Sequence, residues 1–202
     1  DLIDIVAAGR AGIAVCNVPD YGTNEVADHA IALLLSFTRG IPQYTETYRA
    51  DPDKGWDHKI TPVMTRMTGK YFGIIGLGRI GTAAAMRAKG FGMNVMAYDP
   101  YVPYGQELAL NIERAYTLDE LLGAADFISI HTPATELTHH LINQETVEKM
   151  KPGVILINTA RGPICDLDAV YGGLKSGQIG AAGLDVFDPE PACVGRGFSK
   201  KG

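Results

Sequence analysis

Three glycines and one aspartate near the middle of this chain have the types and the spacing that bind a dinucleotide. Gly76, Gly78 and Gly81 form a Gly-x-Gly-x-x-Gly motif. Asp99 follows Gly81 by 18 residues (99 − 81), close to the spacing of about 20 that is expected for an acid on a ribose. In such a motif the first glycine permits a tight turn, the second lets the backbone approach a pyrophosphate, and the third lets a helix pack closely on the sheet.

The chemistry of these residue types indicates which dinucleotide would bind. Arg79 and Ile80 lie inside the motif, at the start of a predicted helix whose unpaired N–H groups and partial positive charge suit phosphates. A carboxylate at Asp99 would accept hydrogen bonds from both hydroxyls of the adenosine ribose and would repel a 2′-phosphate, which favours NAD over NADP. The alternative is a glycine-rich turn between an ordinary strand and helix, with Asp99-Pro100 opening a simple turn.

A regular alternation of strands and helices would position this motif. Strands are expected at 71–75, 93–98, 126–130, 153–158 and 180–184, and helices at 80–89, 118–123, 144–150 and 167–176. Thr117 and Glu120 form a capping box for the second of these helices. Because right-handed crossovers join parallel strands, the sequence predicts a doubly wound parallel α/β sheet, a Rossmann fold that binds ligands at the carboxyl ends of its strands.

The segment before the motif is expected to contain one short strand, one long helix and one long loop. Residues 50–68 are polar and contain Trp56, which we expect to anchor this loop to a surface. The order of the other elements is the end of a helix at 1–11, a strand at 12–15, a turn or hinge at 17–22 and a helix at 24–39.

The helix expected at 24–39 has a distinctive composition. Thr23 or Asn24 would cap its beginning. Gly40 and Pro42 would end it. Its centre is apolar nearly all round, so we expect it to be buried on more than one side, either inside the domain or against a partner subunit. We favour the partner, and we therefore expect a homodimer through this helix.

The composition of the 202-residue chain is that of an ordinary globular protein. Hydrophobic residues make up 46% and charged residues 20%, which is enough to fill a core. The net charge of −5 gives no electrostatic footprint for nucleic acid, and no apolar run reaches the roughly 18 residues of a membrane span. The start of the chain has no signal-peptide pattern, and Cys16, Cys165 and Cys193 lack the spacing of a metal site, so we expect free thiols in a reducing cytoplasm.

Chemically useful residues follow the later predicted strands directly. Because the carboxyl ends of parallel strands lie at one edge of a sheet, these residues should face the same crevice as the glycine motif. They are His131, Thr132 and Pro133 after the third strand, Thr159, Ala160 and Arg161 after the fourth, and Asp185 and Glu190 after the fifth. We expect His131 to be a structural or cofactor-adjacent residue rather than an acid/base catalyst.

Several segments along the chain form an ordered set. The most specific are Asn158-Thr159-Ala160-Arg161-Gly162 and Gly183-Leu184-Asp185-Val186-Phe187, followed by Glu190-Pro191. This set resembles the D-isomer-specific 2-hydroxyacid dehydrogenases, and the resemblance runs from about residue 3 to residue 191. The segments 24–30, 76–81, 139–143 and 150–153 agree with it. Within the family, 14–17, 98–101 and 139–143 resemble the branch of the C-terminal binding proteins, which are transcriptional co-repressors, and many metabolic enzymes of the family are similar there too.

The resemblance implies hydride transfer between NAD and a D-2-hydroxy acid or its 2-keto acid. Arg161 would hold the carboxylate and the keto oxygen of the substrate. Glu190 would hydrogen-bond a catalytic histidine and raise its pKa. Asp185 would bind the nicotinamide carboxamide. The other contacts implied are Thr159 and Ala160 on the nicotinamide face and Thr132 and Pro133 on the adenosine side.

The chain departs from the family pattern at both ends. Residues 1–18 would be a remnant of the family's substrate-binding domain and hinge, and 19–191 would be the NAD-binding domain. The basic, glycine-rich segment 192–202 resembles nothing in the family, and we expect it to be disordered. No histidine follows Glu190, where the family has its catalytic histidine. We therefore expect a truncated chain that is inactive by itself.

Two functions from different classes follow from these observations. The first is the cofactor-binding part of a D-2-hydroxyacid dehydrogenase that acts on a small 2-keto or 2-hydroxy acid. The second is a non-catalytic, NAD-responsive module that binds other proteins, as in the co-repressor branch. Arg161 and Glu190 favour the dehydrogenase, whereas the missing histidine and substrate-binding domain favour the binding module for this chain as it stands. We adopt the dehydrogenase. A phosphate-binding or flavin-binding domain is disfavoured by Asp99 and by the motifs after the later strands.

Overall fold

Residues 3–57, 60–61 and 63–189 of the chain are described by a computed structural model, and a parallel sheet lies at its centre. The described residues form six strands in the order β3-β2-β1-β4-β5-β6. The chain leaves β1 toward one edge of the sheet and returns to β4 on the other side, so the sheet is doubly wound and the predicted fold class is confirmed. The strands are β1 (Tyr71–Ile75), β2 (Asn94–Tyr98), β3 (Glu113–Arg114), β4 (Phe127–Ile130), β5 (Val154–Asn158) and β6 (Ile179–Leu184).

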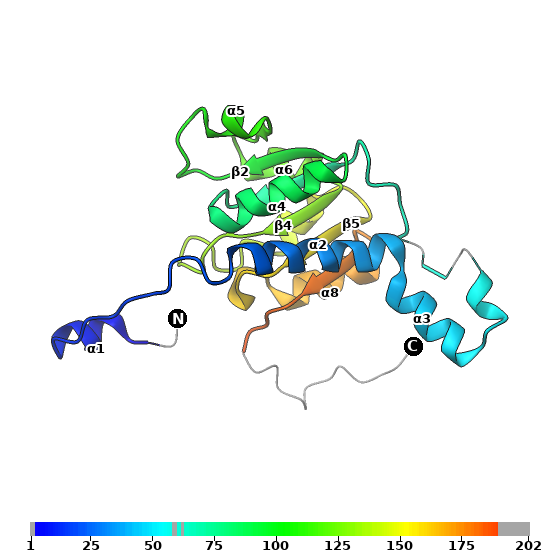
Figure 1. Cartoon of the computed structure of the whole chain (residues 1–202), viewed down its shortest axis with the longest axis horizontal. Helices are drawn as coiled ribbons and strands as arrows, with labels where there is room; N and C mark the ends of the chain where they lie inside the picture. The colour runs from blue at the N-terminus through cyan, green and yellow to red at the C-terminus, as the bar shows by residue number, and fades with distance from the viewer. Residues whose placement is uncertain (1–2, 58–59, 62, 190–202) are drawn as a thin grey trace.

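Helices cover both faces of this sheet, which explains the composition of its central strands (Figure 1). Every residue of β4 and β5 is buried, as expected for parallel strands that lie between two layers of helices. The helices are α1 (Ile5–Arg10), α2 (Thr23–Arg39), α3 (Ile41–Ala50), α4 (Arg79–Gly90), α5 (Gln106–Leu110), α6 (Leu118–Ala124), α7 (Gln144–Glu148) and α8 (Leu167–Ser176), with 3₁₀ turns at Lys54–Trp56 and Gly162–Ile164.

The two layers bury separate halves of the core. On one face, α2 and α4 cover the sheet with apolar side chains such as Leu34 and Ala85, which lie in one cluster with Phe127. On the other face, α6, α7 and α8 do the same, and Leu121 and Val170 belong to that second cluster. The long helix α2 is therefore part of the layer that covers this face of the sheet. It packs against α4, the helix that contains Gly81 of the motif.

Of the caps predicted for two helices, one is present in the structure. The Thr117 hydroxyl accepts a hydrogen bond from the Glu120 N–H at 3.1 Å, and α6 follows. The Glu120 carboxylate accepts from the Tyr116 N–H at 2.8 Å and not from the Thr117 N–H, so only the Thr117 half of the predicted capping box is present. By contrast, α2 begins after Gly22 without a side-chain cap among the described residues, so the predicted cap at Thr23 or Asn24 is wrong.

The structure corrects several other predictions for the segment before β1. Residues 12–15 form no strand, and Ile13 is 61% exposed. Helix α2 ends at Arg39 with Gly40 as its C-cap, as predicted, but a helix that was not predicted, α3, begins at Ile41. Pro42 lies in the first turn of α3, where its missing N–H costs nothing, so it starts a helix where we expected it to stop one. Trp56 is 85% exposed and anchors its loop to no surface of the described chain.

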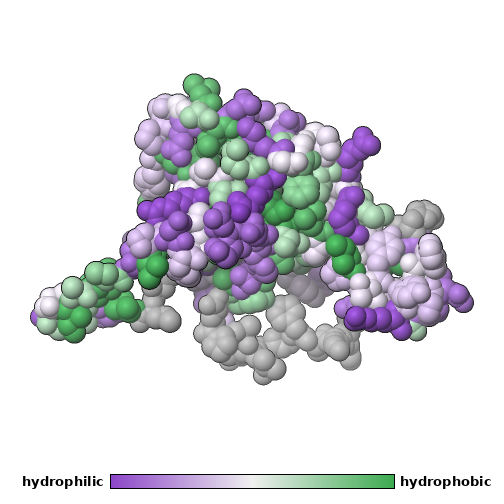
Figure 2. All heavy atoms as spheres, viewed as in Figure 1, coloured by the Kyte–Doolittle hydropathy of each residue, from purple (hydrophilic) through white to green (hydrophobic). Residues whose placement is uncertain are grey.

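The segment 3–18 lies apart from the sheet. Its helix α1 begins at a cap on Asp4 and buries no residue within the described chain, so it is a short capped helix rather than the end of one (Figure 1). Figure 2 shows hydrophobic side chains gathered on this projecting segment, among them Ile5 and Val6. The division of the chain at residue 18 stays a prediction, and segment 192–202 lies outside the described residues. No helix in the described ranges is long and apolar enough to cross a membrane.

Candidate cofactor-binding site

The register of the sheet brings the predicted site residues to one edge. Ile75 lies opposite both Tyr98 and Ile130, and Asn158 lies opposite both Ile130 and Leu184. Five strands therefore end at the same level. The residues that follow these ends directly are Gly76, Asp99, His131, Thr159 and Asp185. The sequence predicted that these residues share a crevice, and the pairing of the strands places them along one edge.

The three glycines of the motif meet three different geometric demands. Gly76 has a φ of 95°, and a Cβ there would lie 2.9 Å from the backbone of His131 and Thr132. A Cβ on Gly81 would lie 2.0 Å from the Gly76 carbonyl oxygen, so the helix could not approach the turn as closely. A Cβ on Gly78 would meet no described atom within 4 Å. Gly78 therefore leaves an open cradle, whereas the other two glycines allow close packing.

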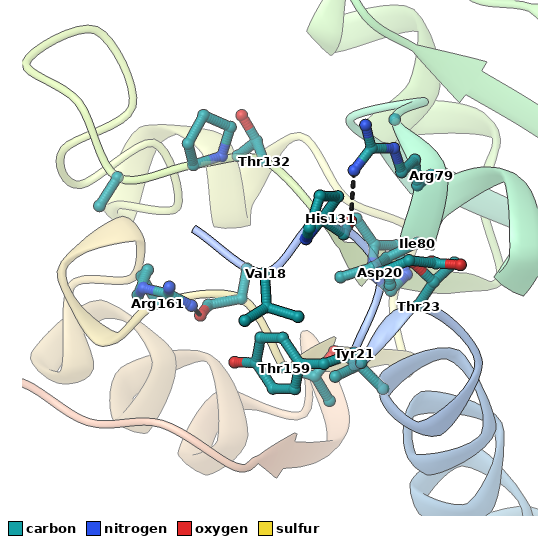
Figure 3. A pocket seen from close by; sticks show the side chains of 17 residues that line it. Val18, Asp20, Tyr21, Thr23, Arg79, Ile80, His131, Thr132, Thr159 and Arg161 are labelled. Carbon is teal, nitrogen blue, oxygen red and sulfur yellow. Dashed lines mark hydrogen bonds between the residues drawn. The ribbon is translucent and has the colours of Figure 1, made fainter. Parts of the chain in front are cut away.

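The beginning of α4 opens into this cradle. Gly78 is the N-cap of α4, and no described side chain caps the helix, so its first N–H groups keep their capacity to bind an anion. The Arg79 guanidinium donates a hydrogen bond to the Pro19 carbonyl, which ties the segment before α2 to the glycine turn (Figure 3). Arg79 and Ile80 thus lie where the sequence placed them.

Asp99 is held beside the glycine turn by backbone donors. Its carboxylate accepts hydrogen bonds from the Leu77 N–H and the Tyr101 N–H, both at 2.9 Å. A carboxylate has about four acceptor sites, so about two remain for the hydroxyls of a ribose. The pocket beside it has a volume of about 500 Å³, and its wall includes Tyr98, Asp99, Pro100, Thr132, Pro133 and Leu141.

A second pocket of about 500 Å³ continues on the other side of the glycine turn (Figure 3). Both pockets are lined by Gly78, His131, Thr132 and Pro133, so they form one cleft with two compartments. The second compartment is lined in addition by Val18, Tyr21, Arg79, Ile80, Thr159, Ala160 and Arg161. The Thr159 hydroxyl oxygen in this compartment is buried and has no hydrogen-bond partner among the described residues. A bound ligand could supply the missing partner.

The turn that carries Arg161 is fixed by Asn158. The Asn158 side chain accepts from the Ala160 N–H at 3.0 Å and donates to the Arg161 carbonyl at 2.9 Å. The Arg161 guanidinium donates to the Ala160 carbonyl at 2.6 Å and is exposed to the cleft. The structure therefore joins Arg161 to Thr159 and Ala160 in one compartment, as the sequence predicted.

Asp185 and Glu190 fit the cleft less completely. Asp185 follows β6, but it is not part of the wall of either compartment. Its carboxylate lies 3.4 Å from Nε2 of His29 on α2, and both side chains are about half exposed. Glu190 lies outside the described residues. Sequence reasoning missed the contact of His29, because nothing in the sequence relates the face of one helix to the end of a distant strand.

His131 lines both compartments and is half-buried. One of its ring nitrogens, Nε2, is 2.9 Å from the hydroxyl of Ser129, which is itself fully buried. Burial lowers the pKa of His131 to about 4, so the ring is neutral at neutral pH. A neutral ring that is bonded to its own strand and lines the cleft is consistent with the structural or cofactor-adjacent role that we expected. Among the described residues, no three His, Cys, Asp or Glu side chains lie close enough to hold a metal ion.

The domain that contains this cleft is similar to a family of known proteins. Residues 31–199 match the model of the D-isomer specific 2-hydroxyacid dehydrogenase, NAD binding domain. The chain belongs to this family. The D-3-phosphoglycerate dehydrogenase of Methanocaldococcus jannaschii is 42% identical over 191 residues, which are 95% of this chain and 36% of that protein. The enzyme of the same name from Mycobacterium leprae is 43% identical over 95% of this chain and 35% of its own length. The chain thus spans about a third of the length of these curated relatives.

Solved structures confirm the fold of this NAD-binding domain. The D-mandelate dehydrogenase of Rhodotorula graminis has a TM-score of 0.87 at 36% identity, over 95% of this chain and 57% of that one. The D-lactate dehydrogenase of Escherichia coli has a TM-score of 0.80 at 37% identity, over 94% of this chain and 58% of that one. NAD, the predicted cofactor, is therefore the cofactor of the domain that this chain contains. The similarity to the branch of the C-terminal binding proteins stays a prediction.

The residues of the 2-hydroxyacid dehydrogenase domain fit NAD on three observations. The cradle at Gly78 is open where a pyrophosphate needs backbone contact. Asp99 keeps acceptor sites beside one compartment, and the Thr159 hydroxyl is unpartnered among the described residues of the other. A dinucleotide has two ends joined by a pyrophosphate, and the cleft has two compartments joined at a phosphate cradle.

Proposed function

We propose that this domain holds NAD along the carboxyl edge of its sheet and presents it to a 2-keto or 2-hydroxy acid bound at Arg161. The observation that carries the proposal is the two-part cleft that meets at Gly78, with Asp99 beside one compartment and Arg161 in the other. Because the chain spans about a third of its curated relatives, the reaction is proposed for the protein that contains these residues.

Each end of the cofactor would meet its own set of residues. Asp99 accepts hydrogen bonds from the adenosine ribose, and the first N–H groups of α4, from Arg79 and Ile80 on, bind the pyrophosphate. Thr132 and Pro133 line the adenosine compartment. Thr159 and Ala160 line the nicotinamide compartment, and Asp185, at the end of β6, binds the carboxamide.

The substrate would be held by Arg161. A guanidinium is planar and permanently charged, so it donates two parallel hydrogen bonds to a carboxylate and also reaches the keto oxygen. NAD, when bound, supplies or accepts the hydride. Glu190 would raise the pKa of a histidine that moves the proton, yet no histidine follows Glu190 in these 202 residues. We propose that these residues alone bind NAD without turnover.

An activity assay on the longest natural polypeptide that contains these residues tests the role of Arg161. With NADH and glyoxylate, hydroxypyruvate or pyruvate, Arg161→Met should lower kcat/KM at least about 100-fold, because a charge-assisted pair is lost in the transition state. The Kd for NADH should rise less than about threefold, since most cofactor contacts remain. Arg39→Met is the matched control, because Arg39 donates to the Thr65 carbonyl, away from the cleft. An unchanged kcat/KM for Arg161→Met would refute the assignment.

Association through α2 stays part of the proposal. Inside the chain α2 buries Ala27, Ala30, Ile31 and Leu34, while Ala32 stays exposed and Leu33 and Leu35 are half-buried. Leu33 and Leu35 pack partly against the core of the same domain, and we propose that the part of this face that stays accessible meets the partner subunit of a homodimer. Light scattering should give twice the chain mass at high concentration with NAD. A monomer would contradict this interface. The cytoplasmic location expected from the thiols is also kept as a proposal.

The co-repressor-like alternative is the weaker candidate. The relatives that match the chain are named as dehydrogenases of small acids. Steady NADH loss in the activity assay would exclude a purely binding role, because a binding module has no turnover.

A further inference from the structure

The edge strand β3 carries one side chain that reaches the loop after β2. Arg114 lies on β3, and its side chain is only 13% exposed. One guanidinium nitrogen donates to the carbonyl oxygens of Val102 at 2.9 Å and Asp99 at 3.4 Å. The other donates to the Pro103 carbonyl at 3.3 Å and to the Glu107 carboxylate at 3.2 Å. A single guanidinium therefore gathers three backbone carbonyls of the loop that begins with Asp99.

The position of Arg114 is itself fixed from two sides. The Tyr104 ring lies over its guanidinium carbon, 4.4 Å from the ring centroid. The Glu107 carboxylate, which pairs with it, also accepts from the Gly105 N–H at 3.1 Å. Burial of the cation between a ring and a carboxylate leaves it one orientation, with its donors directed at the loop.

The loop gathered by Arg114 determines where the Asp99 carboxylate points. Asp99 is bonded through its carbonyl oxygen to Arg114, and through its carboxylate to the N–H groups of Leu77 and Tyr101. Hydrogen bonds thus restrain both the backbone and the side chain of Asp99. The carboxylate has little freedom to turn away from the adenosine compartment.

We infer that Arg114 is a positioning residue for the adenosine end of the cofactor, which holds Asp99 in the place where it binds the ribose of NADH and repels the 2′-phosphate of NADPH. The inference rests on the proposed role of Asp99. We do not expect Arg114 itself to bind a 2′-phosphate, because both of its terminal nitrogens are engaged by three carbonyls and Glu107. Its effect on the choice between NADH and NADPH is transmitted by the shape of the loop.

Calorimetric titration of Arg114→Lys with NADH and with NADPH tests this inference. Lysine keeps the charge but is a point donor without the planar fork, so it leaves at least two of the carbonyls unbonded. The Kd for NADH should rise about tenfold, the size of one weakened charge-assisted hydrogen bond. The Kd for NADPH should stay the same or fall, because a loosened Asp99 repels its 2′-phosphate less. The ratio of the Kd for NADPH to the Kd for NADH should therefore fall about tenfold.

Control variants separate this role from simple destabilisation. Glu107→Gln should lower the same ratio by a smaller factor, since it removes the carboxylate that holds Arg114. Arg39→Met removes an arginine-to-carbonyl bond elsewhere and should leave the ratio unchanged. A melting curve of each variant establishes that it is folded, and Glu107→Gln carries the test if Arg114→Lys does not fold.

The outcomes are distinct. A fall in the ratio with Arg114→Lys supports the inference. An equal loss of affinity for both cofactors, or no change in either, overturns it, because a purely structural residue would not affect one cofactor alone. If the unsubstituted chain binds neither cofactor, the proposed function is itself refuted, and the inference falls with it.

Discussion

Substitution by alanine should lower the stability of the fold at Gly81 but lower the affinity for NADH at Gly78. Alanine at Gly81 places a Cβ 2.0 Å from the Gly76 carbonyl oxygen. The oxygen belongs to the backbone and cannot rotate away, so helix α4 has to move outward by at least about 1.4 Å (3.4 − 2.0) to restore an ordinary contact. Overpacking of this kind costs about 1–3 kcal/mol. For a chain of this size, Tm should fall by about 2–4 °C for each kcal/mol.

Alanine at Gly78 should leave the fold intact and weaken the binding of NADH. Gly78 has φ −76° and ψ −160°, an extended conformation that any residue adopts, and its Cβ would meet no described atom. The substitution should therefore be neutral, or stabilise the fold by about 0.4–1 kcal/mol through the unfolded chain. The new methyl group would occupy the cradle, so the Kd for NADH should rise at least about tenfold, which is about 1.4 kcal/mol.

A melting curve and a calorimetric titration on each variant check this pair. The expected result is a stable Gly78→Ala that binds NADH weakly and a Gly81→Ala with a lowered Tm. Gly78→Ala with the affinity of the unsubstituted chain would refute the phosphate cradle. Gly81→Ala with an unchanged Tm would refute the close contact between α4 and the turn.

Two further predictions concern stability. Burial acts to raise the pKa of Asp126, but the Tyr71 N–H, Lys151 and Lys70 outweigh it and hold that pKa below its usual value of 3.8. The carboxylate thus stabilises the fold above pH 3.8, and this contribution is lost as the pH falls through the lowered pKa. Asp126→Asn should lower Tm at pH 7, and the difference from the unsubstituted chain should shrink near pH 3; a constant difference would contradict the ion pairs. Asp166 caps α8, so Asp166→Ala should cost about 1 kcal/mol in urea unfolding, and an unchanged midpoint would contradict the cap.

The sequence predicted the part of the fold that periodicity determines. The strands that end at Ile75, Tyr98, Ile130, Asn158 and Leu184 were expected with these ends, because apolar runs stop there and polar residues follow. The residues after the first four of these ends line the cleft, whereas Asp185 after the fifth does not, so much of the cleft could be predicted. The orientation of their side chains follows from the pairing of the strands, which no local pattern contains.

The elements that were missed have short or misleading signals. The edge strand β3 has only two residues, too few for an alternating pattern, and α5 has only five. Helix α3 was missed because Pro42 was interpreted as the end of a helix. Arg114 could not be assigned a role, because its bonds to the loop of Asp99 depend on where β3 joins the sheet.

Titration of the 202-residue chain with NADH and, separately, with NADPH tests the central claim most directly. The account predicts saturable binding of NADH and at least about tenfold weaker binding of NADPH, since Asp99 repels a 2′-phosphate. Asp99→Asn should reduce this difference. Equal affinity for both cofactors would contradict the assignment of Asp99, and binding of neither would contradict the cofactor site itself.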